Sequence, residues 1–432
     1  MEIEACIQAF LQNISPIEKT ETVHLLDSCG RIAAARVCAP QMVPAFPKSA
    51  MDGYAVRAED TVGATKDKPV ILKVIGELCA GDYKEFVYVQ NTAVRIMTGA
   101  YVPEGFDAVI RQEDTDYGVE YVKIYKGVAS YTNYCKVGED IKQGDVVLEK
   151  GSRITPLHIG LLASLGIAYI DVFTPVKVAI LSTGSELVNL DEPLGQTCKQ
   201  AISQPLDQSL QQTLTQTPKQ PLEWGKIYNS IAYMLYAAIS KEGFPVVFVE
   251  TCPDNRERLL DSMKRALELA DIVITTGGVS VGKKDLLPEV LDAIGAEKLF
   301  TRANIQPGTP TIGSVCDTKP ILSLSGNPFA AFANFEIYFW ELAAALMHND
   351  SFRVRKGKAV LESDYPKVNH LRRFVRAYAF EQKRGVRVSI PSDIHSSSVI
   401  SNMVQCNCFI DLEAGRKVSV GDVVDIWYFK GE

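Results

Sequence analysis

The segment ADIVITTGGVSVGKKDLLP, residues 270–288, decides the fold of this chain. Its apolar run Ile-Val-Ile leads directly into Thr-Thr-Gly-Gly, which is the pattern of a buried parallel strand that ends in a tight turn. We therefore expect a strand over residues 271–275, a turn over 276–278 and a helix from about Lys284.

The turn has the composition of a phosphate-binding loop. Gly277 and Gly278 allow a tight turn and a close approach of the backbone to a ligand. Their N–H groups, the hydroxyls of Thr276 and Ser280, and the positive end of the next helix suit a phosphate. An ordinary strand-to-helix turn has the same composition, so this turn alone is weak evidence for a ligand site.

The sequence around this segment alternates between strand and helix patterns. We expect strands over 176–181, 245–250 and 320–324, and helices over 227–240, 256–269 and 331–347. This alternation predicts a parallel sheet covered by helices on both faces.

Three turns should meet at one edge of that sheet. Ligands of open α/β sheets bind beyond the carboxyl ends of the strands. The turns at 183–186, 276–278 and 325–328 each follow an expected strand. Their meeting favours a ligand site more strongly than any single turn does.

The remaining regions have other patterns. Residues 1–40 have a helical pattern with Ala5, Ile7, Phe10 and Leu11 on one face, followed by a second apolar segment over 23–35. Short β-rich pieces at 70–75, 86–89, 108–110 and 121–125 predict a small β-barrel or sandwich, and 156–165 predicts a helix. The pieces at 374–380, 386–390 and 423–428 predict a separate β domain, whereas the glutamine-rich stretch 196–224 predicts a solvated insertion.

Length and composition limit the class of protein. A chain of 432 residues is expected to form roughly three domains. It has no apolar run of about 18 residues and an acidic start, so we expect a cytoplasmic protein without a membrane span. A net charge of -7 and a pI near 5.5 argue against general nucleic-acid binding.

Cysteines and histidines give no metal pattern. The ten cysteines are scattered, and only Cys406 and Cys408 are close, at a spacing that matches no usual zinc or redox pair. We expect all ten to be reduced thiols. The five histidines are separated from one another, which argues against a histidine metal cluster.

Five segments point to one family. They are Ser49–Val56 (SAMDGYAV), Arg95–Ala100 (RIMTGA), Gly138–Asp140 (GED), Gly277–Gly282 (GGVSVG) and Gly326–Pro328 (GNP). With these segments, in this order, the chain resembles the molybdopterin molybdenumtransferase family, the bacterial MoeA-type proteins that are related to the E domain of gephyrin. The resemblance covers nearly the whole chain.

The resemblance implies a multidomain α/β plus β fold. Its parts are a molybdopterin-binding α/β domain with a parallel-type sheet, an inserted β domain, an extended helical linking domain and a C-terminal β-barrel. The implied ranges are 1–33 and 141–172 for the linking domain, 34–140 for the inserted domain, 173–350 for the α/β domain and 351–432 for the barrel. The family usually forms a homodimer whose cleft lies between the α/β domain of one subunit and the inserted domain of the other.

The resemblance also implies an activity. The family transfers molybdate to adenylylated molybdopterin, cleaves the pyrophosphate with a divalent metal such as Mg²⁺, and releases AMP. Oxygen ligands, above all carboxylates, suit Mg²⁺ on a pyrophosphate. A molybdopterin adenylyltransferase and molybdoenzymes are candidate protein partners.

Site residues are carried over by motif. The expected catalytic residues are Asp52, Asp140, Glu186, Asp254 and Asp285, of which Glu186 and Asp254 are also the expected metal ligands. The expected ligand-binding residues are Thr183, Gly184, Ser230, Thr276, Gly277, Gly278, Ser280, Gly282, Pro307, Gly308, Ser325 and Asn327. Turn formation or loop capping would explain Asp52, Asp140 and Glu186 equally simply.

Four positions depart from the family pattern. Pro47 stands where the family usually has Asp, Asn229 where it has Asp, and Thr309 where it has Lys, while Lys136 is what remains of an arginine-rich segment. Loss of the lysine weakens an anion site, because charge-assisted hydrogen bonds are about twice as strong as neutral ones.

Two hypotheses of different class follow. The chain is either a working transferase for molybdate or an altered oxyanion such as tungstate, or a non-catalytic paralogue that carries pterin or serves as a scaffold. The five retained acids favour the enzyme.

Overall fold

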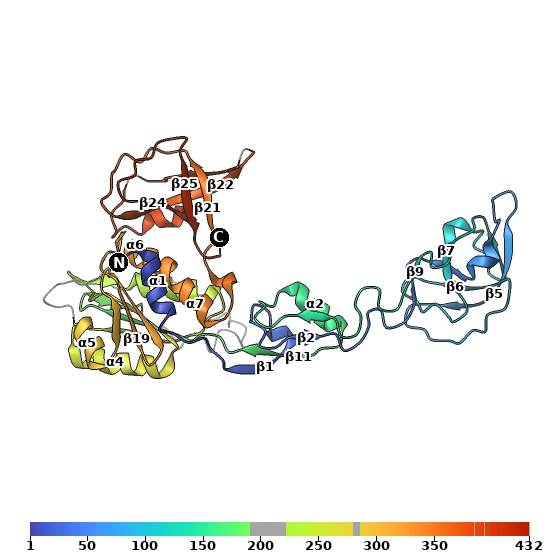
Figure 1. Cartoon of the computed structure of the whole chain (residues 1–432), viewed down its shortest axis with the longest axis horizontal. Coiled ribbons are helices and arrows are strands. Elements are labelled where there is room, and N and C mark those ends of the chain that lie inside the picture. The colour runs from blue at the N-terminus through green and yellow to red at the C-terminus, as the bar shows by residue number, and fades with distance from the viewer. Residues whose placement is uncertain (191–221, 280–285, 384, 393, 432) are drawn as a thin grey trace.

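The computed structural model describes residues 1–190, 222–279, 286–383, 385–392 and 394–431. Ser280, Gly282, Asp285 and most of the glutamine-rich stretch therefore lie outside the described residues. The molecule is elongated, with the α/β domain and the barrel at one end and the inserted β domain at the other, joined by a narrow linking part (Figure 1).

A six-stranded sheet forms the centre of the α/β domain. Its spatial order is β15 (Val246–Cys252), β12 (Val178–Thr183), β16 (Ile272–Thr276), β20 (Lys319–Leu324), β19 (Ile312–Cys316) and β17 (Glu297–Phe300). The first four strands are parallel, as expected from the alternating pattern.

The last two strands correct the expectation of a parallel sheet. β19 pairs with β20 and with β17 in antiparallel fashion. β19 and β20 are antiparallel because a two-residue turn at Asp317 and Thr318 joins them. Both residues have positive φ (49° and 65°), which is the conformation of a tight hairpin.

Helices cover both faces of the sheet. α3 (Ser230–Lys241), α6 (Pro328–Asn334) and α7 (Trp340–Leu346) pack with the side chains of one face, such as Ile272 and Ile274. α4 (Arg256–Leu269) and α5 (Leu287–Ala293) pack with the other face, such as Val273. The expected range of α4 is confirmed to the residue, whereas α5 begins at Leu287, after the residues that are not described.

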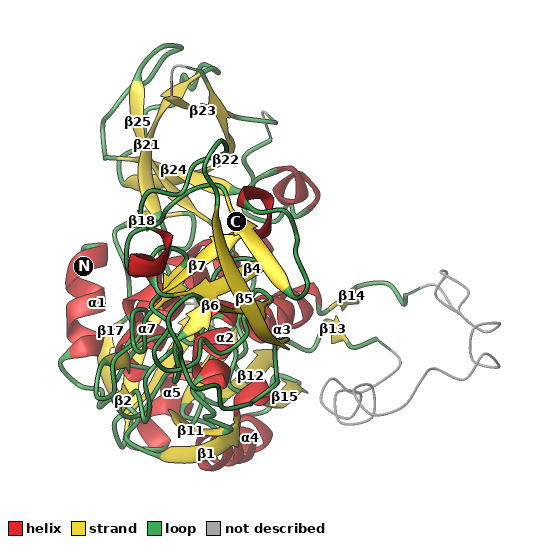
Figure 2. Cartoon of the chain, turned by 90° about the vertical axis from the view of Figure 1, so that its right-hand side faces the viewer, coloured by secondary structure: helices red, strands yellow, loops and turns green. Residues whose placement is uncertain are grey.

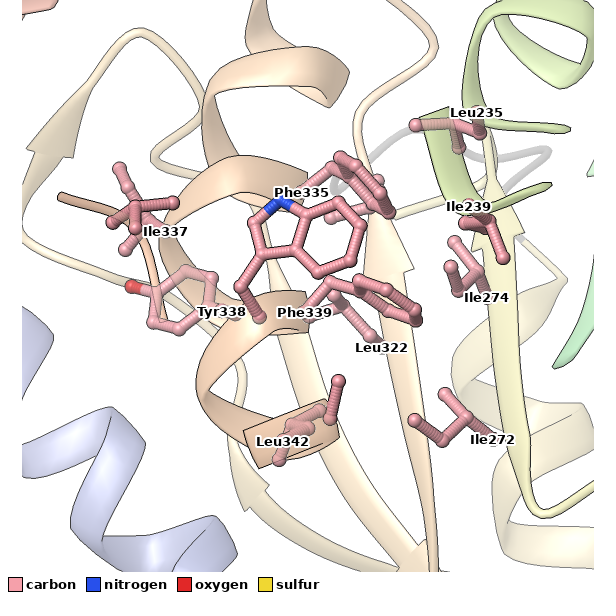
Figure 3. Packing of buried hydrophobic residues seen from close by; sticks show 14 of the residues in the cluster. Leu235, Ile239, Ile272, Ile274, Leu322, Phe335, Ile337, Tyr338, Phe339 and Leu342 are labelled. Atoms are coloured by element: carbon pink, nitrogen blue, oxygen red, sulfur yellow. The ribbon is translucent and has the colours of Figure 1, made fainter. Parts of the chain in front are cut away.

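A helix rich in aromatic residues covers the face of the sheet that carries Ile272 and Ile274. α6 and α7 are joined by a five-residue π-helical turn, Phe335–Phe339, so the expected helix 331–347 is one continuous element that starts earlier, at Pro328. In Figure 3 the rings of Phe335 and Phe339 lie against Leu322 and face Ile274 of the sheet. Burial of these large rings supplies much of the free energy that holds the helix on the sheet.

The first 35 residues differ from the helical expectation. α1 (Ile3–Leu11) buries Ile3, Cys6 and Phe10 against the α/β core, while Ala5 is exposed. The segment that follows forms no α-helix: β1 (Thr20–His24) pairs with β11 (Tyr169–Phe173), and only a short 3-10 turn, Leu25–Asp27, comes after it. β-branched Thr20, Thr22 and Val23 favour this strand.

The linking part is small. Besides β1 and β11 it contains α2 (Pro156–Ser164), β2 (Val37–Cys38) and β10 (Val146–Leu148). Thr155 caps α2 in a reciprocal box with His158, which explains where this helix begins. The domain boundaries given above stay a proposal.

The inserted domain is a five-stranded sheet. Its order is β7 (Ala108–Arg111), β4 (Gly53–Val56), β6 (Thr92–Ile96), β5 (Val70–Leu78) and β8 (Tyr121–Ile124), with β3 (Lys48–Ser49) and β9 (Tyr134–Cys135) as a separate pair. The expected strand at 86–89 is wrong, because this segment has no ladder partner and instead packs the Phe86 ring on Gly76.

The C-terminal domain is a closed barrel. Its strands are β21 (Lys356–Leu361), β22 (Arg372–Gln382), β23 (Gly385–Ser389), β24 (Cys408–Leu412) and β25 (Val423–Tyr428), and β22–β24 pairing closes the ring. β18 (Ile305–Gln306), from the α/β segment, also joins β22. Figure 2 shows the barrel strands above the α/β domain, and the small pair β13 (Leu187–Val188) and β14 (Ile227–Tyr228) at its side.

Two absences concern the described residues only. None of their helices is both long enough and apolar enough to cross a membrane. Their nine cysteines are free thiols, as expected.

Glu336 generates a stability prediction. Burial raises the pKa of this carboxyl from 4.5 to about 7, although the N–H groups of Trp340 and Lys430 donate to it at 3.0 and 2.8 Å. Because the folded-state pKa is the higher one, the stabilising contribution is complete below about pH 4.5 and is lost as the pH rises through about 7. Glu336→Gln should therefore gain stability relative to the parent by up to about 1.4 kcal/mol per pH unit across this window.

Thermal unfolding of both proteins at several pH values between 5 and 8 measures this difference. Glu381→Gln, at an exposed barrel position, is the control. A Glu336→Gln minus parent difference that does not change with pH would contradict the prediction.

Candidate functional site

The three predicted turns meet at the carboxyl edge of the sheet. The Gly277 N–H donates to the carbonyl of Leu324, the last residue of β20, at 3.0 Å. The Thr183 hydroxyl, at the end of β12, donates to the Thr276 carbonyl at 3.4 Å. Strand ends far apart in the sequence are thus joined into one surface, called here the rim (residues 183–186, 276–278 and 325–328).

Glycine is required at the centre of the rim. Gly277 and Gly278 have φ values of +85° and +65°, a region that side chains disfavour. A Cβ on Gly277 would lie 2.4 Å from the Thr183 carbonyl oxygen. The turn therefore brings bare backbone to the surface, which is the arrangement that a phosphate or pterin cradle needs.

Two hydroxyl groups of the rim already form hydrogen bonds within the protein. Thr276 is buried, and its hydroxyl donates to the Ser182 hydroxyl at 2.9 Å within the sheet. The Ser325 hydroxyl accepts the Asn327 N–H at 3.2 Å and so shapes its own turn. Thr276 and Ser325 thus support the rim through internal bonds.

A small cavity lies beside the rim. Its lining includes Thr183, Glu186, Ser230, Thr276 and Gly326, and its volume is about 60 Å³. Sites that enclose a ligand usually measure about 300 to 1,000 Å³. This cavity alone is therefore too small to enclose a ligand of that class.

Asn229 has a capping role. Its side-chain oxygen accepts the Ala232 N–H at 3.2 Å, and its amide donates to the Thr251 hydroxyl at 2.9 Å. A carboxylate could accept the first bond but could not donate the second. Asparagine at this position therefore donates a bond within the α/β domain that an aspartate could not donate.

Glu186 and Asp254 are exposed carboxylates at the ends of neighbouring strands. The Ser185 N–H donates to Asp254 at 3.3 Å, and the Asp254 N–H donates to the Ser185 hydroxyl at 3.1 Å. Ser185 therefore holds Asp254 at the turn that precedes Glu186.

This donor set fits magnesium that is shared with a substrate. No group of three or more acidic, histidine or cysteine ligands occurs within the described ranges. Mg²⁺ is commonly held by one or two carboxylates together with substrate phosphates and water. Glu186 and Asp254 supply two exposed carboxylates at the ends of neighbouring strands, which is the number and type of ligand that such an ion takes from the protein.

Asp52 lies between β3 and β4 of the inserted domain, which stands at the opposite end of the molecule from the α/β domain (Figure 1). Asp140 lies where the chain returns to the linking part, next to Ile141. The N–H and the hydroxyl of Thr98 both donate to Asp52 at 2.7 Å, and they lower the pKa of this carboxyl. Asp140 is exposed, in a turn where its N–H donates to the Val43 carbonyl at 3.1 Å. Within one chain, the inserted domain stands apart from the α/β domain that carries the rim (Figure 1).

The turn at residues 307–310 lies beside the barrel. The Asn334 amide donates to the Gly308 carbonyl at 2.8 Å and holds the turn on α6. Thr309 and Gln306 line a groove together with Asn369 and Arg373 of the barrel domain. Sequence reasoning missed Asn334, Asn369 and Arg373, and the adjacent arginines 372 and 373 were the only signal that could have drawn attention to them.

Comparisons with known proteins agree with this architecture. Family models match residues 1–166 (MoeA N-terminal region, domains I and II), 179–344 (probable molybdopterin binding domain) and 358–429 (MoeA C-terminal region, domain IV). The chain is 35% identical to a molybdopterin molybdenumtransferase of Bacillus subtilis over 92% of this chain and 87% of the relative. It is 35% identical to one of Staphylococcus epidermidis over 94% and 91%.

A solved structure shows the same fold. The crystal structure of a molybdopterin biosynthesis MoeA protein from Pyrococcus horikoshii covers 100% of both chains at 29% identity, with a TM-score of 0.79. The chain therefore belongs to the MoeA family of molybdopterin molybdenumtransferases, which is a family of molybdenum cofactor biosynthesis.

Proposed function

We propose that this chain transfers molybdate to adenylylated molybdopterin and releases AMP. The observation that supports this most is the meeting of three strand-end turns around Gly277 and Gly278 in a chain of the MoeA family. Exposed backbone at this edge suits the phosphate-bearing end of a pterin. We further propose a cytoplasmic location, in keeping with a biosynthetic transferase.

Different residues of the chain would bind the pterin phosphate and the metal ion. The rim backbone would hold the pterin phosphate, and Glu186 and Asp254 would hold Mg²⁺ against the pyrophosphate. When bound, the metal supplies charge neutralisation on the phosphoryl oxygens. Asp52, which stays ionised because of its two bonds from Thr98, would serve as a fixed negative charge and not as a general acid.

A dimer would complete the site. The inserted domain stands apart from the α/β domain of its own chain (Figure 1), so Asp52, and Asp140 at the neck of that domain, would act at a rim if the inserted domain of a second chain reaches it. We propose such a shared cleft. We also propose two protein partners. A molybdopterin adenylyltransferase would supply the substrate, and a molybdoenzyme would receive the product.

Release of AMP tests the function directly. Purified protein, adenylylated molybdopterin, Mg²⁺ and either molybdate or tungstate should yield AMP and a metal-loaded cofactor. The two oxyanions separate a molybdenum enzyme from a tungsten enzyme. Binding of the pterin without any AMP release would favour the carrier or scaffold alternative, which the family comparisons do not favour.

Gly278→Val should weaken molybdopterin binding by at least about tenfold, the value of one or two hydrogen bonds. The valine would cover the rim backbone and meet the Thr183 hydroxyl, 3.0 Å from its Cβ. Titration calorimetry measures the affinity. Gly295→Val is a matched control, because Gly295 has a similar φ of +72° with no neighbouring atom within 4 Å.

Both variants should lose stability, since both force a β-branched residue to positive φ, and Gly278→Val should lose somewhat more because its Cβ also meets Thr183. Equal pterin affinity of the Gly278→Val and Gly295→Val proteins would show that the ligand binds elsewhere.

Mixed dimers should recover activity. A chain with Asp140→Ala keeps its rim, and a chain with Gly278→Val keeps its inserted domain, so one cleft of each mixed dimer would be intact. Neither variant alone should release AMP at the parental rate, whereas co-expressed chains should recover part of it. A monomer by light scattering at micromolar concentration, or no recovery in verified mixed dimers, would refute the shared cleft.

A further inference from the structure

Lys226 is a cation that contacts the rim. The rim segments 183–186, 276–278 and 325–328 contain no lysine or arginine. Among the described residues that hydrogen bond to them, one is a cation: the Lys226 ammonium donates to the Ser185 carbonyl at 2.7 Å. Lys226 is half-buried and forms no ion pair with a described carboxylate. An ammonium has three donors, so two remain for a ligand.

A backbone ladder fixes the place of Lys226. β13 and β14 run parallel, with Leu187 opposite Ile227. The Ile227 N–H donates to the Glu186 carbonyl at 2.9 Å, so Lys226 lies beside the turn that leads to Glu186. The Lys226 N–H donates to the Glu223 carbonyl at 3.1 Å. The ammonium is thus held at the rim before a ligand arrives, which lowers the conformational entropy lost on binding.

Three charged side chains contact the dipeptide Gly184–Ser185. Lys226 binds the Ser185 carbonyl, and Asp254 accepts the Ser185 N–H at 3.3 Å. The Glu186 carboxylate lies against Gly184, because a Cβ on this glycine would stand 2.6 and 2.7 Å from its two oxygens. One cation therefore shares a short turn with the two carboxylates that we propose as ligands of Mg²⁺.

The charges of the proposed complex call for such a cation. The pyrophosphate of adenylylated molybdopterin carries a negative charge on each phosphate, and Glu186 and Asp254 add one each. A single Mg²⁺ ion compensates only half of this charge. AMP, the product, is a phosphate monoester and carries more negative charge than the same phosphate in the pyrophosphate. A positive group that is fixed in advance stabilises charge of this kind.

We propose that Lys226 binds a phosphate of the substrate at the rim, beside Mg²⁺, and compensates negative charge that the metal ion leaves. The phosphate belongs to the adenylyl group or to the pterin, which offer the same tetrahedral set of oxygens. An ammonium suits a phosphate as a compact point charge. This inference rests on the proposed function and adds a substrate-binding residue outside the set that the family motifs marked.

Lys226→Met removes the charge and the bond to Ser185 with little change in length. In the presence of Mg²⁺ it should weaken AMP binding by about tenfold, the value of one charge-assisted hydrogen bond at a partly exposed site. Adenosine lacks the phosphate, so its affinity should not change. Lys226→Arg keeps the charge and should keep most of the AMP affinity. Lys264→Met, at an exposed position of α4, is the matched control.

Binding of Mn²⁺ alone separates a charge effect from a role in holding the turn. Mn²⁺ takes the same oxygen ligands as Mg²⁺ and can be followed by electron paramagnetic resonance. Removal of a nearby positive charge should tighten Mn²⁺ binding to Lys226→Met by about two- to threefold. If Lys226 only held the turn, its loss would displace Glu186 and Asp254, and Mn²⁺ binding would weaken.

Titration calorimetry with AMP and with molybdopterin identifies the phosphate. A loss confined to AMP places Lys226 at the adenylyl phosphate, a loss confined to molybdopterin places it at the pterin phosphate, and a loss of both places it between the two.

Four results would overturn the proposal. They are a parent that binds neither ligand, a folded Lys226→Met protein that binds both as the parent does, equal losses in the Lys264→Met control, and a loss of Mn²⁺ or adenosine binding that matches the loss of AMP binding. Because no arm requires AMP release, the proposed function could fail while the role of Lys226 is upheld, and the reverse.

Discussion

Parallel hydrogen bonding between β12, β16 and β20 is the interaction on which the site depends. The register aligns Thr276 with Ser182 on one side and with Leu324 on the other, so the three strands end at nearly the same level. Each following turn then starts beside its neighbour. The glycines complete the arrangement, since only a residue without a side chain can lie this close to the Thr183 carbonyl.

Local signals made much of the fold predictable. α4 has an asparagine cap and a regular apolar stripe, and its range could be predicted to the residue. The apolar runs that became β16 and β20 were equally clear. The hairpin between β19 and β20 could not be predicted in the same way, because Asp-Thr is not a strong turn sequence and its positive φ values appear only in the structure. The helical interpretation of residues 23–35 failed because Val23, His24 and Ala33 pair with β11, which lies far away in the sequence.

The parts of the candidate site also differ in how far the sequence predicts them. The rim followed from strand order and glycine turns, which are local patterns with a known spatial consequence. The groove at Arg373 depends on a non-local ladder between β18 and β22, which no pattern in either segment reveals. This ladder, together with the Phe329 N–H that donates to the Ser397 carbonyl at 3.0 Å, makes the barrel a part of the α/β edge. Side chains of the barrel can therefore contribute to chemistry at that edge.

The narrow linking part has a mechanical consequence. The chain enters the inserted domain near Val43 and leaves it near Ile141, and these two residues are joined by the Val43 N–H and the Ile141 carbonyl at 2.8 Å. The inserted domain is thus joined to the linking part by two chain segments that lie side by side. Two such segments resist twisting about the long axis far more than one would, while they leave bending easier. A small bend at the linking part would therefore displace the far end of the inserted domain by much more than the linking part itself moves.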